Sequence, residues 1–449
     1  MRIFNYSIEE LHLMLQERRI SANELLKETI GITQKYNPVY KPFVQLDFNT
    51  YSESANELDE KIKTGESIPR MAGLPVGVKD IFNTVDFPTQ MGSEIWKGFT
   101  PGNDARVVSY LRNAGMSVIG KTVTAEFAVH ALNETLNPYD VARTPGTSSS
   151  GSVVAVALGM VPIALASQTA GSIIRPGSFC GVYGFKPSFG LIPRTGALKT
   201  TDSLDSVGYF VSNVNNLRPV LDCIRVRGPN YPMSYQAFKD ENRLSAPKNR
   251  PWKVAILKGK TWDLASEECK LQFDKFVNSL EKQGVIPELV DIDFLNDAHA
   301  IHENIYNKSL SYYFEAESKN VEVISSVMSE MIRKGKSITA ADYVESLQRQ
   351  SSHIIKVDRM LSDYDVGISL STGSVAPLRN EVEVDDPSLI WTLTHLPALN
   401  VPLFKSTENL PFGLQVVSRK YNDYKLLSFV EQFASRGTFP TGCVMDHYD

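Results

Sequence analysis

The sequence predicts an α/β protein in which buried strands are covered by helices and a helical segment interrupts the core. Two observations on the pattern of elements predict this class. From Met71 to about Ser212, short Gly-, Val- and Ala-rich runs of strand type alternate with helical ones. From about 213 to 360 the sequence turns polar and helical, and from about Tyr364 strands and turns return. One core is therefore assembled from both ends of the chain, with a helical insertion between them.

The first elements along the chain are predicted to be helices. Ser7 with Glu10 three residues later is a capping-box pattern, Ser21 caps a second helix, and a charged amphipathic helix ends at Gly65. We expect these helices to pack on the outside of the core. The chain then divides into four regions: an N-terminal helical region at 1–70, the core at 71–215, the helical insertion or small subdomain at 216–360, and strands with a final helix that complete the core at 361–449.

The composition limits the classes of partner. Of the 449 residues, 42% are apolar and 22% are charged, which is ordinary for a globular protein. The formal net charge is -5, and there is no long Lys/Arg run. Nucleic-acid binding needs a concentrated basic surface, so we expect no nucleic acid as partner.

The cysteines and the N-terminus predict the compartment. The four cysteines form no C-x-x-C pair and have no metal-ligand spacing, so we interpret them as free thiols in a reducing environment: Cys180, Cys223, Cys269 and Cys443. Glu9 and Glu10 interrupt the apolar run that a secretory peptide would need. We therefore expect a cytoplasmic protein.

One uncharged stretch could be mistaken for a membrane span. No charged residue lies between Gly146 and Ile174, but the apolar part runs only from Val153 to Ala166 and contains Pro162. A bilayer span needs roughly 20 apolar residues. A buried helix that leads into a buried strand is the better interpretation, and we expect no membrane association.

The same stretch contains the candidate chemistry. Thr147 to Ser150, followed by Gly151, could alone be a flexible linker, but it runs directly into an apolar helix and strand. This context favours hydroxyl groups held on a rigid frame. Further on, a strand, a tight glycine turn and Ser172 resemble the geometry that exposes a nucleophile beside backbone N–H donors.

A serine nucleophile needs a base, and no histidine has the pattern of one. His299 and His302 lie at i, i+3 on a predicted helix without a third ligand, so we interpret them as a surface pair. Lys79 ends an otherwise uncharged strand, GLPVGVKD. Burial can lower the pKa of a lysine from about 10.4 by several units, which makes Lys79 the candidate base. A lysine next to Asp80 could instead be a solvated or salt-bridged group.

Together these residues resemble the amidase signature family of Ser-Ser-Lys hydrolases. GTSSSGSVVAVALG (146–159) matches the family's glycine- and serine-rich signature, and QTAGSIIRP (168–176) matches its nucleophile turn. GLPVGVKD, PTQMGS, PALNVPLF and LPFGLQVV are similar to further family segments. The resemblance extends from about residue 5 to the end and is weakest between 215 and 360. It implies the amidase-signature fold, a mixed central β-sheet covered by helices on both sides, with a helical insertion.

The resemblance also implies the site and the reaction. Ser172 corresponds to the nucleophile, Ser148 to a bridging serine on an unusual cis peptide, and Lys79 to the general base. The oxyanion-hole N–H groups would come from three residues: Thr169, Ala170 and Gly171. The implied reaction is hydrolysis of a non-peptide carboxamide C–N bond through an acyl-enzyme on Ser172. No metal or organic cofactor is implied. The implied partner is a small-molecule amide substrate, and the resemblance makes a homodimer a possible assembly.

The chain departs from the family pattern at the nucleophile turn. The family's acidic residue is Gln168 here, Ala170 replaces a glycine, and the arginine is displaced by one residue to Arg175. A neutral Gln168 cannot form an ion pair with an arginine, so we expect this turn to be braced differently. The substrate pocket is expected to be formed by the insertion and the loops around Met91 and Trp391, where the resemblance is weakest.

Two alternatives stay open. One is a glutamine amidotransferase subunit that releases ammonia for tRNA-linked amidation, although such subunits usually read DTGGSIRQP at the turn. The other is a catalytically silent binding or scaffold protein on the same fold.

Overall fold

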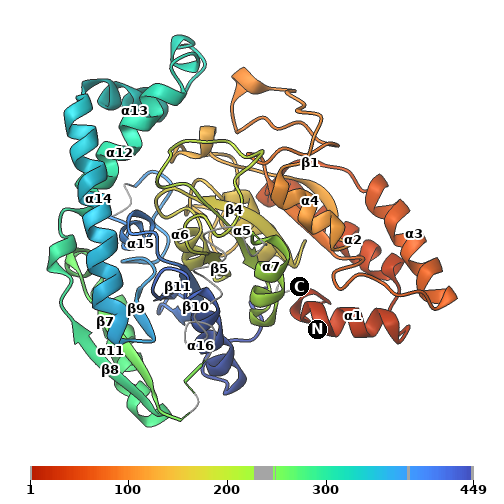
Figure 1. Cartoon of the computed structure of the whole chain (residues 1–449). Helices are drawn as coiled ribbons and strands as arrows, with labels where there is room; N and C mark the ends of the chain where they lie inside the picture. Colours follow the sequence, from red (N-terminus) through yellow and green to blue (C-terminus); the bar gives the residue numbers. More distant parts are fainter. Residues whose placement is uncertain (1–2, 227–245, 248, 382–384, 446–449) are drawn as a thin grey trace.

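The centre of the molecule is one mixed β-sheet surrounded by helices (Figure 1). The computed structural model describes residues 3–226, 246–247, 249–381 and 385–445. Within these residues the sheet has 11 strands in the order β1-β3-β2-β4-β6-β5-β10-β11-β9-β7-β8. The predicted α/β class with a mixed central sheet is confirmed.

The strands run from both halves of the chain: β1 (Phe43–Leu46), β2 (Pro75–Lys79), β3 (Ser117–Thr122), β4 (Ile163–Gln168), β5 (Tyr183–Lys186), β6 (Ser206–Val211), β7 (Trp252–Leu257), β8 (Val285–Val290), β9 (Val366–Leu370), β10 (Ala398–Lys405) and β11 (Pro411–Val417). The helices are α1 (Ile8–Gln16), α2 (Ala22–Tyr40), α3 (Asn49–Thr64), α4 (Arg106–Asn113), α5 (Ser150–Ala157), α6 (Ile174–Phe179), α7 (Leu217–Ile224), α10 (Lys260–Asp263), α11 (Glu267–Leu280), α12 (Ala298–Tyr313), α13 (Ser326–Ser337), α14 (Ala340–Met360), α15 (Leu389–Leu393) and α16 (Asp423–Ser435).

The parallel strands β2, β3 and β4 form the part of the sheet that positions the site. Lys79 lies opposite Thr122, and Val78 lies opposite Leu165. All residues of β2 and β3 are buried, including Lys79 in β2 and Lys121 in β3. Lys79 ends β2 and Gln168 ends β4. Since parallel strands end at the same edge of a sheet, the lysine and the turn after β4 are brought to one place.

Helix α5 carries the glycine- and serine-rich segment into the core. Every residue of α5 is buried, and the helix packs on β2, β3, β4 and β6. Gly151 allows this close approach, because a Cβ atom there would lie 2.3 Å from Pro42 O and 2.3 Å from Val123 N. The predicted buried helix followed by a buried strand is confirmed. Among the described residues no helix combines the length and apolarity that a bilayer span requires.

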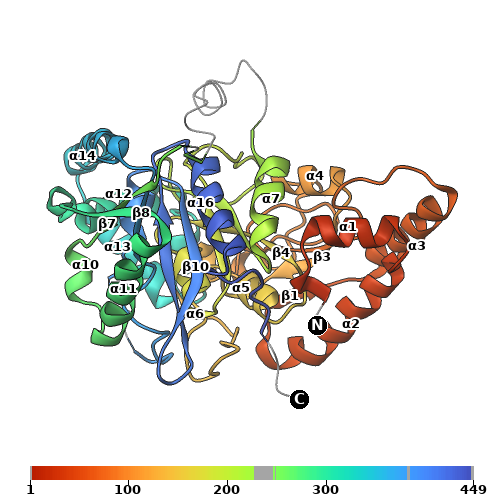
Figure 2. The same cartoon turned by 90° about the horizontal axis from the view of Figure 1, so that it is seen from below.

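The N-terminal helices form as their sequence predicts. Ser7 and Glu10 make both hydrogen bonds of a capping box, and Ser21 with Glu24 makes another. Helix α3 ends at Gly65, whose φ of 78° is left-handed. Strand β1, which pairs antiparallel with β3 at the sheet edge, was not predicted from the sequence. Helices α1 to α3 lie at the opposite end of the molecule from α12 to α14 (Figure 2).

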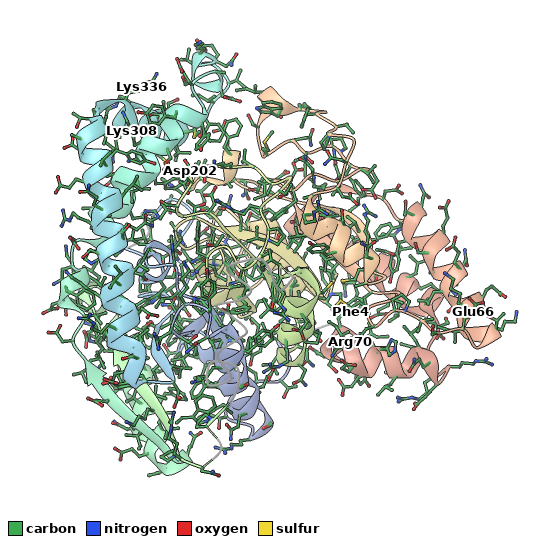
Figure 3. The ribbon with its side chains drawn as sticks, viewed as in Figure 1. Phe4, Glu66, Arg70, Asp202, Lys308 and Lys336 are labelled. Carbon is green, nitrogen blue, oxygen red and sulfur yellow. The ribbon has the colours of Figure 1, made fainter. Side chains whose placement is uncertain are left out.

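The segment between 216 and 360 is not only helical. Strands β7 and β8 lie in this segment and extend the central sheet beyond β9. Helices α12, α13 and α14 pack against one another. The loop with Asp202 lies near this group, and the Tyr313 hydroxyl at the end of α12 donates to its carboxylate at 2.8 Å (Figure 3). Residues 227–245, where polar helical structure was also predicted, lie outside the described residues.

Candidate active site

Lys79 is surrounded by serine hydroxyls rather than by carboxylates. Its Nζ lies 2.7 Å from Ser148 Oγ, 2.9 Å from Ser149 Oγ and 2.9 Å from Ser167 Oγ. The side chain is fully buried. Burial lowers the pKa of Lys79 well below its ordinary value of 10.5, and the charge of Asp205 opposes this effect only in part. Burial therefore favours the uncharged form of this amine.

The neighbouring hydroxyls fix the direction of the amine. The Ser149 hydroxyl donates to Ser167 O at 3.2 Å, so its oxygen is free to accept a hydrogen from Lys79. A neutral amine has two hydrogens and one lone pair. Donation to Ser149 and Ser167 leaves the lone pair for the hydroxyl of Ser148, at the shortest of the three distances.

The loop of Ser148 is held through its main chain. Thr124 Oγ1 donates to Ser148 O at 2.9 Å, and Asn133 Nδ2 donates to Thr147 O at 3.2 Å. The resemblance implied a cis peptide at Ser148, and this expectation is wrong for the structure. The described residues contain only trans peptide bonds, the ordinary form between non-proline residues.

Ser172 lies on the turn between β4 and α6 and is 8% exposed. Gln168 holds this turn. Its Oε1 accepts from the N–H groups of Ile173 at 2.8 Å and Ile174 at 3.0 Å, and its Nε2 donates to Thr392 Oγ1 at 2.9 Å. The uncharged amide thus serves as both acceptor and donor, which a carboxylate could not do.

Arg175 pairs with a residue far along the chain. Its Nε lies 3.1 Å from Asp386 Oδ2, while Asp386 Oδ1 accepts from Ser388 N at 2.8 Å. The Asp386 carboxylate also lies against the turn, because a Cβ atom at Gly171 would be 1.6 Å from Oδ2. The expectation of a different bracing at Gln168 and Arg175 is confirmed.

Two of the turn's carbonyl groups accept hydrogen bonds from side chains of distant helices. His302 Nε2 on α12 lies 2.8 Å from Thr169 O, and Thr392 Oγ1 on α15 lies 2.6 Å from Ala170 O. Burial lowers the pKa of His302 to about 4, so the ring is neutral and its Nε2 carries the hydrogen. The surface interpretation of His302 is wrong, because this side chain is only 3% exposed.

Asp205 supports the turn from another side. Its Oδ1 accepts from the hydroxyls of Thr169 at 2.9 Å, Thr200 at 2.6 Å and Thr201 at 3.0 Å. The N–H groups of Thr200 and Thr201 donate to Oδ2. No role was predicted for Asp205 from the sequence. A run of threonines before an aspartate, TTDSLD, is the local signal that could have indicated such a network.

A cavity of about 190 Å³ lies beside α6, and Lys79, Ser148 and Ser172 are not among its lining residues. Arg175 and Asp386 line it, together with Phe179, Glu381 and Asp385. Met91 and Trp391, around which the pocket was expected, do not line this cavity and pack in a hydrophobic cluster. In the described part of the chain, no three His, Cys, Asp or Glu side chains gather as a metal ion would require.

Comparison with known proteins shows the family to which the chain is similar. The model of the Amidase family matches residues 24–427. A glutamyl-tRNA(Gln) amidotransferase subunit of Heliobacterium modesticaldum (strain ATCC 51547 / Ice1) is 28% identical over 486 residues, which cover 99% of this chain and 98% of that protein.

Two solved structures share the fold over nearly the whole chain. A glutamyl-tRNA(Gln) amidotransferase subunit from Thermotoga maritima has a TM-score of 0.79 at 25% identity and covers 99% of both chains. The native peptide amidase from Stenotrophomonas maltophilia has a TM-score of 0.82 at 21% identity and covers 99% of this chain and 98% of its own. The second likeness shows the fold alone.

These relatives correct the prediction of partners. No nucleic acid was expected as a partner, because the net charge is -5. The relatives are named as subunits of an amidotransferase for glutamyl-tRNA(Gln), so the prediction of a small-molecule partner without nucleic acid is wrong in its exclusion of nucleic acid. Net charge is a sum over the whole surface and does not report which macromolecule an assembly acts on.

The family assignment rests on the match between residues 24 and 427 together with the shared fold. Because the match spans most of the sequence, including the strand of Lys79 and the turn of Ser172, the chain belongs to the amidase family and is an amidohydrolase.

Proposed function

We propose that the chain cleaves a carboxamide C–N bond through an acyl-enzyme on Ser172. The observation that carries this proposal is the fully buried amine of Lys79 at 2.7 Å from Ser148 Oγ. Neutral Lys79 takes the proton of Ser148, and Ser148 takes the proton of Ser172 as its Oγ attacks the carbonyl carbon. When the tetrahedral intermediate collapses, the C–N bond breaks and the proton returns through Ser148 to the leaving nitrogen.

The negative charge on the carbonyl oxygen needs donors during this step. The turn at 169–171 offers backbone N–H groups immediately before the nucleophile. One such donor is typically worth about 3 kcal/mol of the activation barrier. Water then attacks the acyl-enzyme and releases the carboxylic acid.

For the substrate, we propose glutamine in the setting of an amidotransferase subunit that supplies ammonia to glutamyl-tRNA(Gln). The end-to-end similarity to such subunits supports this setting over a stand-alone amidase. The cavity beside α6 carries charges of both signs, from Arg175 and from carboxylates such as Asp385, which suit a zwitterionic amino acid. The departures at Gln168 and Arg175 do not argue against catalysis, since both side chains have other partners.

The first experiment tests the chemistry. Wild-type protein and Ser172→Ala are compared for ammonia release from carboxamides and for labelling by a fluorophosphonate. We expect Ser172→Ala to lose both. The matched control is Ser109→Ala on α4, whose hydroxyl donates only within its own helix, to Ala105 O. Ammonia release by Ser172→Ala at the wild-type rate would refute the assignment.

The second experiment tests the substrate. Ammonia release from glutamine and from a panel of alkyl and aryl carboxamides is measured for the chain alone and with the other amidotransferase subunits of the source organism. Glutamine turnover that rises when those subunits are added supports the proposal. Turnover of another carboxamide by the chain alone, at a higher kcat/KM than glutamine under either condition, would favour a stand-alone amidase instead.

A further inference from the structure

We propose that Thr392 and His302 are positioning residues that orient the anion-stabilising N–H groups of the nucleophile turn. They act through the peptide groups that follow Thr169 and Ala170, without touching the substrate. This inference rests on the proposed function of Ser172.

The geometry of the peptide group connects these side chains to the N–H groups. A trans peptide is rigid and planar, and its C=O and N–H groups point in opposite directions. His302 Nε2 holds Thr169 O at 2.8 Å, so the N–H of Ala170 points away from α12. Thr392 Oγ1 holds Ala170 O at 2.6 Å, so the N–H of Gly171 points away from α15. Each side chain therefore sets the direction of one N–H group on the opposite side of the turn.

The peptide group between Gly171 and Ser172 is held in a different way. Gly171 O accepts from Arg175 N at 2.9 Å, which is an ordinary bond of the first turn of α6. The direction of the Ser172 N–H thus follows from the helix itself. For the two preceding peptides, the side chains that donate to the carbonyl oxygens come from elements 133 and 222 residues away in the sequence. These two N–H groups are the ones that a side-chain substitution can misdirect.

The hydrogen bonds around Thr392 run in one direction, from Gln168 through Thr392 to Ala170. Gln168 Oε1 accepts from Ile173 and Ile174 N–H, so the amide nitrogen of Gln168 faces Thr392. Gln168 Nε2 donates to Thr392 Oγ1, and the single hydroxyl hydrogen of Thr392 goes to Ala170 O at 2.6 Å rather than to Ser388 O, which lies at 3.5 Å. Hydrogen bonds in sequence polarise one another, which strengthens the N–H of Gly171 as a donor.

The same series of hydrogen bonds explains why residue 168 departs from the family pattern. An ionised carboxylate at this position could accept from Ile173 and Ile174 but could not donate to a hydroxyl. Thr392 would then have to donate to that carboxylate and could not donate to Ala170 O. The glutamine at 168 and the threonine at 392 therefore act as a matched pair.

A misdirected N–H group affects the transition state more than substrate binding. The oxyanion forms only as Ser172 attacks, so its stabilisation appears in kcat rather than in KM. The test compares Thr392→Val, which keeps the shape but removes the hydroxyl, with Thr392→Ser, which keeps the hydroxyl. The control is Thr394→Val, because Thr394 is equally buried and its hydroxyl donates only to Ile390 O, at 2.8 Å.

We expect Thr392→Val to lower kcat by about 10- to 100-fold with little change in KM, less than the loss of a direct donor. The rate of fluorophosphonate labelling should fall in parallel, because the tetrahedral phosphonyl adduct also needs the N–H groups. Thr392→Ser and Thr394→Val should stay close to wild type. A wild-type kcat for Thr392→Val, an equal loss in Thr392→Ser, or a loss confined to KM would overturn the inference.

A second pair of variants keeps the test decisive where Thr392→Val does not fold. His302→Gln retains a side-chain N–H near the position of Nε2, and His302→Leu does not. The inference predicts a larger loss of kcat in His302→Leu, and equal losses would contradict it. The same measurements separate failure of the proposed function from failure of this inference. If the proposed function is wrong, Ser172→Ala remains active. If only this inference is wrong, Ser172→Ala is inactive and the Thr392 and His302 variants keep the wild-type kcat.

Discussion

At the scale of single residues, the unusual feature is a buried lysine without a hydrogen-bonded carboxylate. Lys79 meets three serine hydroxyls, and burial is the dominant influence on its pKa. Asp205 acts on Lys79 through its charge, in the direction of a higher pKa. The balance between burial and this one carboxylate decides the pH at which the amine becomes a base.

This balance gives a prediction for the pH dependence of catalysis. Asp205→Asn removes the charge that raises the pKa of Lys79, so the pKa falls further and the neutral amine exists at lower pH. The acidic limb of the kcat/KM profile should therefore shift to lower pH. Asp202→Asn is the control, since Asp202 is an exposed carboxylate of the same loop that pairs with Lys199. A limb that stays in place or moves to higher pH would contradict the role of Asp205.

Sequence motifs identified some of the site residues but not all of their partners. Lys79 and Ser148 were predicted as partners from two separate motifs, and the structure places them in contact. The catalytic roles of these residues and of Ser172 remain predictions for the experiments above. Gln168 was recognised as a departure, but its partner Thr392 was not predicted, because a threonine on a short helix has no distinctive pattern.

At the scale of elements, helix α5 depends on the absence of a side chain. Gly151 lets the first turn of α5 approach Pro42 and Val123, and this turn follows directly after Ser148. Helix α2 also contains a glycine, Gly31, but a Cβ atom there would meet nothing within 4 Å. Substitutions of Gly151 and Gly31 are therefore expected to have opposite effects.

We predict that Gly151→Ala destabilises the fold by about 1–3 kcal/mol, the usual cost of overpacking a core. The clash is with backbone atoms that cannot rotate away, so α5 must shift and kcat should fall as well. Gly31→Ala should instead stabilise α2 by about 0.5–1 kcal/mol, because alanine is the better helix former. Denaturant unfolding of both variants measures the two free energies. Equal effects of the two substitutions would contradict this interpretation of the packing.

At the scale of the whole molecule, burial lowers the pKa of basic groups in the interior. Burial lowers the pKa of Lys186 to about 7, and the pKa of His395 to about 3. Lys186 Nζ donates to Leu396 O, which connects β5 to the loop before β10. Each of these groups binds a proton more readily in the unfolded chain, so each makes stability depend on pH.

Lys186→Met should therefore flatten the pH dependence of stability on the alkaline side. As pH falls from about 10.4, the unfolded wild-type lysine takes a proton while the folded one stays neutral until about pH 7. Over this window, Lys186 should lower the free energy of unfolding of the wild type by at most about 1.4 kcal/mol for each unit that the pH falls. Lys97→Met, at an exposed lysine, is the control. Parallel unfolding curves for Lys186→Met and wild type across the window would refute the prediction.

The sequence by itself determined the α/β order of elements, the capping boxes of α1 and α2, the buried passage from α5 to β4, and the residues proposed for catalysis. These features are local, since periodicity, caps and signature segments lie within a few residues of one another. Only the tertiary structure decided that β1, β7 and β8 join the sheet, and that His302, Thr392 and Asp386 reach the turn before Ser172. Contacts between elements that are not neighbours in the sequence depend on how the chain folds in space, and one sequence has no local pattern that reports them.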